Sequence, residues 1–324
     1  MTAFQYKSST SADVNEHADS LSGWNQQYEQ VSPGRFTGQL DELWLGPVQV
    51  FRESTHQAVL QRGAPCPGTI TVATPVGDRN QGWFCGRSLD GARAFGLVSQ
   101  GEFELATRGD FDIVALSVDT EFLDNYSRRV DGFGFVGALR KNDVIDGNAD
   151  NNAALRDLLL ATLETARNNP KLLEQEALRR ALLNSLCDAL MARIGQHPPQ
   201  ATPGDTTAAT RQRVVREARR YMSEHAEEPI GVPDLCEAIH VSRRTLQYSF
   251  QDVLQMSPVT YLRALRLNGV RRDLRKGGDE PVADRAARWG FWHLSRFAAD
   301  YRHLFGELPS ETLRHSRVLV QSAH

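Results

Sequence analysis

Two groups of polar side chains in the last third of the chain have types and spacings suited to recognising the edges of nucleic-acid bases. The first group is Arg243, Arg244, Gln247 and Tyr248, and the second is His293, Ser295 and Arg296. An arginine fork can donate two hydrogen bonds to guanine, and a glutamine can pair with adenine, each worth roughly 1–3 kcal/mol of discrimination. The residue types therefore predict contacts with base edges, with Arg296 the best candidate in the second group.

Each group lies within one of two copies of the same sequence pattern, residues 235–263 and 282–314. A shift of 51 residues places Leu246 on Phe297, and it also places Pro258 on Pro309. Ahead of the turn the shift is 50, so the second copy carries one extra turn residue. Because each copy has the form short helix, tight turn, second helix, the repeat predicts two helices placed to enter DNA major grooves.

Helical spacing predicts which residues face inward. In the first copy Ser242 is expected to cap the second helix, with Leu246 and Phe250 buried four residues apart. This arrangement leaves the first polar group on the outer face. In the second copy Gly290 is expected to supply the turn. Trp292 has two interpretations, contact with a sugar-phosphate surface or completion of the core, and we expect the core.

A long helix is predicted over residues 258–276, between the two copies. It would link them rigidly and set their spacing. Its basic residues would supply phosphate contacts as a group, although about half are expected to have only solvent-exposed helix partners. They are Arg263, Arg266, Arg271, Arg272, Arg275 and Lys276.

Composition and charge indicate two domains of different kinds. Residues 210–317 contain 19 Lys and Arg against 14 Asp and Glu, a net charge of +5, whereas the rest of the chain has a net charge of −8. A basic domain beside an acidic one is typical of a protein with one nucleic-acid-binding part. The four cysteines are scattered without metal-ligand spacing, which favours free thiols in a reducing cytoplasm. No signal peptide or membrane span is predicted.

The remaining chain is predicted to be β-rich and then helical. Residues 1–20 are polar and expected to be disordered. Short strands separated by Gly, Pro and Asp over 36–118 predict an antiparallel sandwich or small barrel that could enclose a ligand. Helices are predicted over 120–130, 150–168 and 171–194. The last either packs on its own barrel, which we favour, or pairs with a second chain. Residues 195–209 have the composition of a linker.

The C-terminal sequence closely resembles the AraC/XylS family of transcription regulators over about residues 212–315. The resemblance rests on SRRTLQYSFQDVLQMSPVTYLRALRLN and GFWHLSRFAADYRHLFGELPSETLR. It implies an all-α domain of seven helices with two helix-turn-helix motifs, which binds promoter DNA and usually activates RNA polymerase. By position, it implies contacts to bases or backbone from Arg244, Gln247, Tyr248, Ser295, Arg296 and Ala299.

Three positions depart from the family pattern. Gln255 stands where a glycine is usual, although Gly306 is present in the second copy. His240 replaces a common turn glycine, and Arg285 occupies a position that is usually apolar. These departures make the geometry of the first turn less transferable from the family.

The N-terminal half looks similar to regulators of the ethanolamine-operon type. That resemblance implies a cupin-like β-barrel that binds a small effector, followed by helices that form a homodimer. Trp83 could provide an aromatic wall and Arg87 a carboxylate clamp, with His56 as a third candidate.

The combined prediction is an α+β protein of two domains. A cupin-like effector-binding and dimerisation domain over 21–194 precedes a double helix-turn-helix domain over 210–317. The predicted function is a cytoplasmic, nucleoid-associated activator of a catabolic operon that responds to an amine, an amino acid or an aromatic acid. An effector-independent regulator or repressor is the alternative. A cupin-type metalloenzyme is disfavoured because His56 is the only histidine in residues 36–118. We therefore expect no catalytic residue, cofactor or metal.

Overall fold

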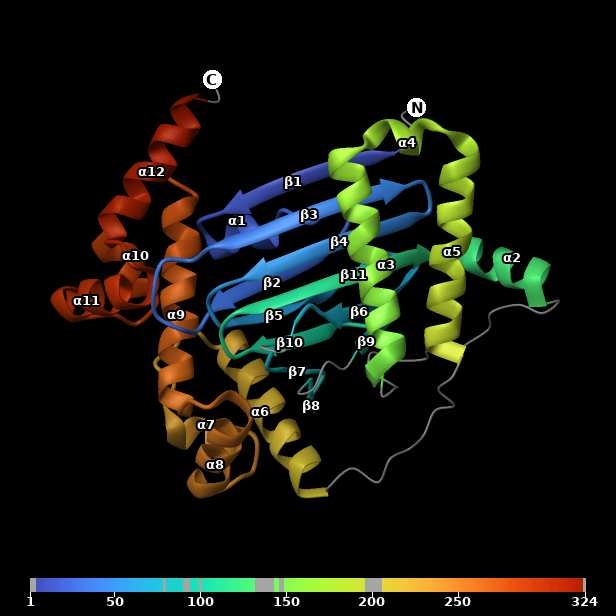
Figure 1. Cartoon of the computed structure of the whole chain (residues 1–324). Helices are drawn as coiled ribbons and strands as arrows, with labels where there is room; N and C mark the ends of the chain where they lie inside the picture. Colours follow the sequence, from blue (N-terminus) through green and yellow to red (C-terminus); the bar gives the residue numbers. More distant parts are fainter. Residues whose placement is uncertain are drawn as a thin grey trace. The chain divides into compact units, whose positions relative to one another are not determined.

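The computed structural model describes residues 4–77, 80–89, 94–98, 101–131, 143–145, 149–195 and 206–322 (Figure 1). The chain forms two compact units, which are described separately. Unit 1 comprises Met1–Tyr28 and Thr37–Ala201, and unit 2 comprises Glu29–Phe36 and Thr202–His324. The division near residue 201 falls within the predicted linker, of which residues 196–205 lie outside the described residues.

Unit 1 is built on two β-sheets. The larger is antiparallel throughout and contains, in spatial order, β1 (Gln5–Ser11), β3 (Gly38–Leu45), β4 (Val48–Thr55), β11 (Phe111–Asp119), β6 (Thr69–Pro75), β9 (Ala94–Val98) and β12 (Asp143–Ile145). The smaller contains β2 (Asn25–Gln30), β5 (Val59–Ala64), β10 (Phe103–Thr107), β7 (Gly82–Phe84) and β8 (Arg87–Ser88).

The two sheets remain separate, so the prediction of a closed cupin-like barrel is wrong. Side chains of β4 alternate between two cores because successive residues of a strand point to opposite faces. Phe51 packs with Phe84 of the smaller sheet, whereas Val50 belongs to a second core on the other face of the larger sheet. The larger sheet is therefore apolar on both faces, and the smaller sheet covers one of them as in a sandwich.

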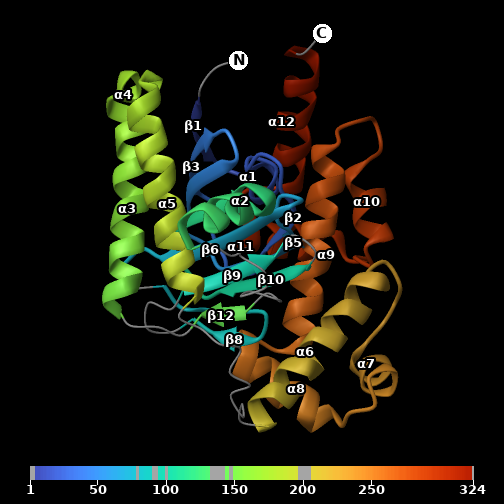
Figure 2. The ribbon, with the colours of Figure 1, turned by 90° about the vertical axis from the view of Figure 1, so that its right-hand side faces the viewer.

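Helices cover the other face of the larger sheet. They are α2 (Thr120–Asp131), α3 (Ala149–Asn168), α4 (Pro170–Glu174) and α5 (Glu176–Gly195). Figures 1 and 2 show α3 and α5 side by side. The helix predicted over 171–194 is broken at Gln175, whose ψ of 114° is extended. Leu186 and Leu190 are fully buried with Leu159, so α5 packs on its own unit, which is the alternative we favoured. Among the described helices, none is sufficiently long and apolar to span a membrane.

The prediction of disorder over residues 1–20 is wrong for residues 4–20. β1 pairs with β3 from Gln5 opposite Trp44 to Ser11 opposite Gly38. It is followed by α1 (Val14–Ala18), where Asp13 accepts hydrogen bonds from the first backbone N–H groups. An edge strand needs few apolar residues because it packs on only one side, so its polar composition concealed it.

Unit 2 is helical apart from the segment Glu29–Phe36. Its helices are α6 (Thr206–Glu224), α7 (Val232–Ala238), α8 (Arg243–Leu254), α9 (Pro258–Arg275), α10 (Val282–Arg288), α11 (Leu294–Phe305) and α12 (Pro309–Ser322). The helix α9 lies where the long linking helix is predicted. Four residues separate α7 from α8 and five separate α10 from α11, so the extra turn residue of the second copy is present.

The close packing of α10 on α9 requires a glycine. A Cβ added at Gly269 would lie 2.4 Å from the ring of Trp289. The Trp289 indole N–H donates a hydrogen bond of 2.8 Å to Asp273. Burial alone would raise the pKa of Asp273, but hydrogen bonds from Trp289 and Lys276 hold it below its ordinary value. The carboxylate therefore stays charged and anchors the indole against α9.

The buried guanidinium of Arg285 satisfies carbonyl groups in the last turn of α9 and in the segment that follows it. It donates hydrogen bonds to the backbone oxygens of Asp273, Gly277 and Glu280. Buried carbonyls without partners are costly, so a polar side chain is useful here where the family usually has an apolar one. At this position Arg285 therefore contributes hydrogen bonds where an apolar side chain would contribute packing.

The two second helices of the repeat end with the same geometry but different residues. Gln255 after α8 has φ of +56°, and Gly306 after α11 has φ of +73°. In both cases the backbone N–H bonds the carbonyl four residues earlier. A left-handed conformation costs an L-residue about 1–2 kcal/mol, whereas glycine adopts it freely. The first copy therefore carries strain that the second avoids.

We predict that Gln255→Gly raises the free energy of unfolding of unit 2 by about 0.5–1 kcal/mol, the relief of strain less the greater entropy of glycine in the unfolded chain. Gly306→Ala should lower it by about 1–2 kcal/mol, and its Cβ would also press on Arg35 at 3.0–3.3 Å. Differential scanning calorimetry of the full chain checks both. A decrease in melting temperature for Gln255→Gly would contradict the interpretation of strain.

Candidate nucleic-acid interface

The first reading helix, α8, presents its polar group to solvent. Leu246 and Phe250 are buried, and Ser242 caps the helix by accepting a 3.1 Å hydrogen bond from the Thr245 N–H. Arg243, Arg244, Gln247 and Tyr248 are all exposed on the N-terminal two turns. This is the part of a helix-turn-helix reading helix that meets base edges.

Arg244 and Tyr248 form a pair one turn apart on α8. The guanidinium carbon of Arg244 lies 5.2 Å from the centre of the Tyr248 ring, and its Nη2 donates a 3.5 Å hydrogen bond to the hydroxyl. The tyrosine side chain is 58% exposed. A flat ring beside the arginine favours an extended, oriented guanidinium, which suits bidentate contact with a base.

The turn before α8 explains how His240 replaces glycine. His240 adopts a φ of +53°, and Gly290 adopts +80° in the second copy. Histidine is one of the residues that tolerate this left-handed region better than most. The turn is thus formed in both copies, with one more residue in the second.

The second reading helix, α11, is held by an aromatic core. The rings of Phe291 and Phe297 lie 5.1 Å apart, and Phe297 lies 5.8 Å from Tyr301. Burial raises the pKa of Tyr301 to about 12, so its hydroxyl stays neutral between Arg271 and Thr312. The predicted contact residues His293, Ser295, Arg296 and Ala299 are exposed.

Trp292 does not complete the core, and our expectation that it would is wrong. It is 75% exposed in the turn before α11, beside the exposed Leu294. Phe291 and Trp289 occupy the core positions instead, because the extra turn residue shifts Trp292 outward. The surface around the start of α11 is therefore more apolar than the surface of α8.

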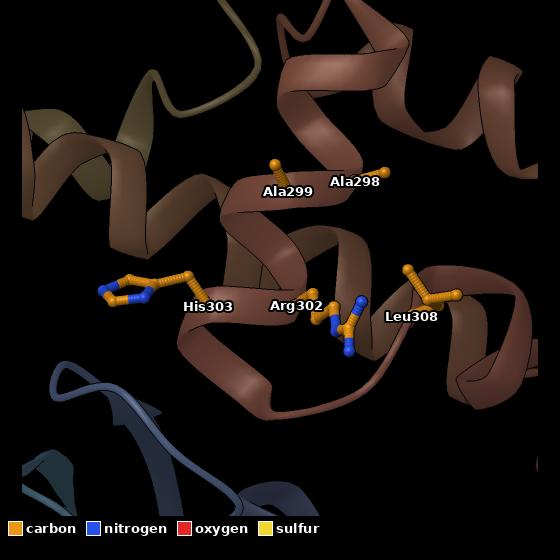
Figure 3. Close-up of a pocket in the computed structure, with 5 residues that line it drawn as sticks. All are labelled: Ala298, Ala299, Arg302, His303 and Leu308. Carbon is orange, nitrogen blue, oxygen red and sulfur yellow. The ribbon is translucent and has the colours of Figure 1, made fainter.

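A shallow hollow that sequence analysis missed lies on α11 (Figure 3). It has a volume of about 540 Å³ and is lined by Ala298, Ala299, Arg302, His303 and Leu308. Small alanine side chains create it, and both Arg302 and His303 are exposed one turn beyond Ala298 and Ala299. The i, i+4 spacing from the predicted contact Ala299 to His303 was the signal in the sequence that could have identified them.

Several basic residues of α9 are used inside unit 2. Arg271 is only 4% exposed and forms a 2.9 Å ion pair with Glu307. Arg263 pairs with Asp300, and Arg266 donates to the carbonyls of Ala226 and Glu228. The prediction that these six basic residues act together on phosphates is therefore wrong for Arg271, whose guanidinium is buried.

The effector-binding residues predicted in unit 1 are not brought together. Phe84 pairs with Arg87, and Trp83 pairs with Ser88. Directly paired residues share a face, so Trp83 and Arg87 point to opposite sides of the sheet. Arg108 lies over the Trp83 ring at 3.9 Å, and Arg87 donates to the Val144 carbonyl. His56 is exposed beside Asp110.

Comparison with known proteins places a family match in unit 2. A family model described as a helix-turn-helix domain matches residues 235–315. The chain is 38% identical over 119 residues to the "Probable thc operon regulatory protein" of Rhodococcus erythropolis, covering 36% of this chain and 33% of that one. It is 34% identical over 97 residues to the "XylDLEGF operon transcriptional activator" of Pseudomonas putida, covering 29% and 30%. The chain thus spans about a third of the length of these curated relatives.

A solved structure, a "probable AraC family transcriptional regulator" from Rhodopseudomonas palustris, is 32% identical. The match covers 32% of this chain and 97% of that one, with a TM-score of 0.31.

Two helix-turn-helix motifs joined by one long helix define the class of unit 2. Over residues 235–315 the chain has a helix-turn-helix domain of the kind found in AraC/XylS-type transcription regulators. The matched relatives are described as an operon regulatory protein and an operon transcriptional activator, in agreement with the prediction of a regulator rather than an enzyme. Similarity of the N-terminal half to the ethanolamine-operon type is not part of this assignment and stays a prediction.

Proposed function

We propose that the chain is a sequence-specific DNA-binding regulator that activates transcription of an operon in response to a small molecule. The observation that carries the proposal is the pair of reading helices, each with exposed polar residues at its start and an apolar face buried on its own core. The matched relatives, an operon regulator and an operon activator, support this assignment.

The two reading helices would enter successive major grooves on one face of DNA. Such grooves are separated by one turn, roughly 34 Å. Arg244 and Gln247 would contact bases in one half of the site and Arg296 in the other. The turn before α11 exposes Trp292, and the first residue of α11 is the exposed Leu294. Since this surface is more apolar than that of α8, the first copy would contribute more of the sequence specificity. RNA polymerase is the partner expected of an activator.

Unit 1 would bind the effector and bias the protein between an inactive and an active arrangement. A ligand can shift such an equilibrium only by its difference in affinity for the two states. The aromatic interior between the two sheets, with Phe51, Phe84 and Phe95, would favour an amine, amino acid or aromatic acid with an apolar part. The polar contacts of such a ligand would come from residues other than the predicted Trp83, Arg87 and His56.

We predict that Arg244→Ala and Gln247→Ala relax specificity in one half of the DNA site, and that Arg296→Ala relaxes it in the other half. Each substitution should cost about 1–3 kcal/mol of discrimination, the value of a bidentate base contact. The measurement is selection from a random duplex library, followed by titration. Arg128→Ala on α2, an exposed arginine paired with Asp124, is the matched control. If each substitution instead lowers the affinity equally for all DNA sequences and reduces its salt dependence, Arg244, Gln247 and Arg296 contact phosphates rather than bases.

We expect an effector to raise the melting temperature of the full chain. A ligand present at 100 times its dissociation constant stabilises the folded state by about 2.7 kcal/mol. Thermal-shift screening with amines, amino acids and aromatic acids measures this, and a positive compound should also change the affinity for the selected DNA. If no compound moves the melting temperature, the effector-independent regulator or repressor is supported instead.

The exposed side of α4 and α5 is our proposed homodimer contact. Leu172 and Leu178 are 41% and 46% exposed there. We predict that Leu178→Glu shifts the full chain from dimer to monomer in sedimentation experiments, because a carboxylate resists burial in an apolar interface. The control is Asn184→Glu, which adds the same charge at another exposed residue of α5. It tests whether an added charge alone shifts the chain from dimer to monomer. A wild-type chain that stays monomeric at high concentration would refute the contact.

A further inference from the structure

Unit 2 contains a short segment from the other end of the sequence. Residues Glu29–Phe36, hereafter the strap, belong to this unit although more than 160 residues separate them from its helices. The strap follows directly on Tyr28, whose hydroxyl donates a 2.5 Å hydrogen bond to Glu53 within unit 1. One strand, β2, thus contributes residues to both units.

The middle of α9 is built to bind the strap. Asn268 is completely buried. Its Oδ1 accepts a 3.1 Å hydrogen bond from the Gln30 N–H, and its Nδ2 donates a 2.9 Å bond to the Gln30 carbonyl. The side-chain amide therefore pairs with both the backbone N–H and the C=O of one residue, as a residue of a neighbouring β-strand would. A buried asparagine without these bonds would cost stability, so its presence in an apolar helix face depends on the strap.

The strap also caps the second reading helix. The last carbonyls of a helix have no partner within it. In α11 the carbonyl of Leu304 accepts a 2.5 Å bond from the Gln30 side-chain amide and a 3.1 Å bond from the Gly34 N–H. The same amide nitrogen lies 2.9 Å from the Ser32 carbonyl oxygen and 2.7 Å from that of Gly34, so its two N–H groups are shared among three acceptors and hold the strap in its turn.

A third contact links the strap to the first half of unit 2. Glu29 is buried and accepts a 3.1 Å hydrogen bond from the Tyr261 hydroxyl at the start of α9. The same hydroxyl accepts a 3.2 Å bond from Nε of Arg219 on α6. The Tyr261 ring lies 5.8 Å from that of Phe250 on α8. Glu29 therefore bonds to the part of unit 2 that carries α8, and the adjacent Gln30 bonds to α11.

We propose that the strap fixes the relative placement of the two reading helices, and thereby the spacing between the two DNA half-elements that the protein accepts. Gln30 is the principal positioning residue because, among the strap residues, it bonds both α9, through Asn268, and α11, through Leu304. This inference rests on the proposed function, since it concerns how the pair of helices meets DNA. It also means that a fragment starting at residue 202 lacks part of its own reading unit.

The test compares the full chain with Gln30→Met, which keeps the side-chain length but removes the amide. Binding is titrated against duplexes carrying the selected site and against duplexes with two base pairs added or removed between its halves, a displacement of about 7 Å. For the wild type, altered spacing should reduce affinity by about tenfold or more, and this fold-loss of affinity is the spacing penalty. For Gln30→Met that spacing penalty should fall at least about threefold, because the second helix can adopt more placements.

The control is Gln27→Met, the same substitution at an exposed residue of the same strand. It should retain the wild-type spacing penalty. If Gln30→Met does not fold, as judged by circular dichroism, Gln30→Asn keeps an amide that is too short to reach Leu304.

The proposal is overturned if a folded Gln30 variant has the wild-type spacing penalty, even with a lower melting temperature, because the strap would then be only structural. A wild-type chain that selects no DNA sequence is a different result, which overturns the proposed function and this inference with it.

Discussion

The burial of α9 is the constraint on which unit 2 depends. This helix is enclosed along most of its length, so its polar groups must find partners inside the protein. Arg271 pairs with Glu307, and Asn268 pairs with the backbone of Gln30. Gly269 admits the Trp289 ring. A linking helix held in this way transmits the position of one reading helix to the other, which a flexible connection would not do.

The two copies of the repeat show how one local design tolerates different solutions. The first accepts left-handed conformations at His240 and Gln255, whereas the second uses Gly290 and Gly306. The strained copy carries the more polar reading surface. The relaxed copy has its last turn tied down by the strap through Leu304. The copies are therefore equivalent in fold but unequal in the chemistry that they present.

Unit 1 shows where composition misleads. The strands predicted over 36–118 are apolar and regularly punctuated, and the structure contains strands in the corresponding places. The polar strand β1 was concealed because an edge strand requires little apolar surface. Closure of the sheets could not be inferred, since a sandwich and a barrel share the same alternation of side chains along each strand. The pairing of Trp83 with Ser88 rather than Arg87 depends on register, which composition does not reveal.

The sequence by itself determined the tandem helix-turn-helix unit, the extra turn residue of the second copy and the outward face of α8. These features follow from local periodicity and from turn and capping residues, which act over a few positions. Only the tertiary structure decided that Trp292 faces solvent, that Arg271 is buried and that Glu29–Phe36 completes unit 2. Such outcomes depend on which distant groups meet, because a buried amide or guanidinium is stable only where partners far along the chain satisfy it.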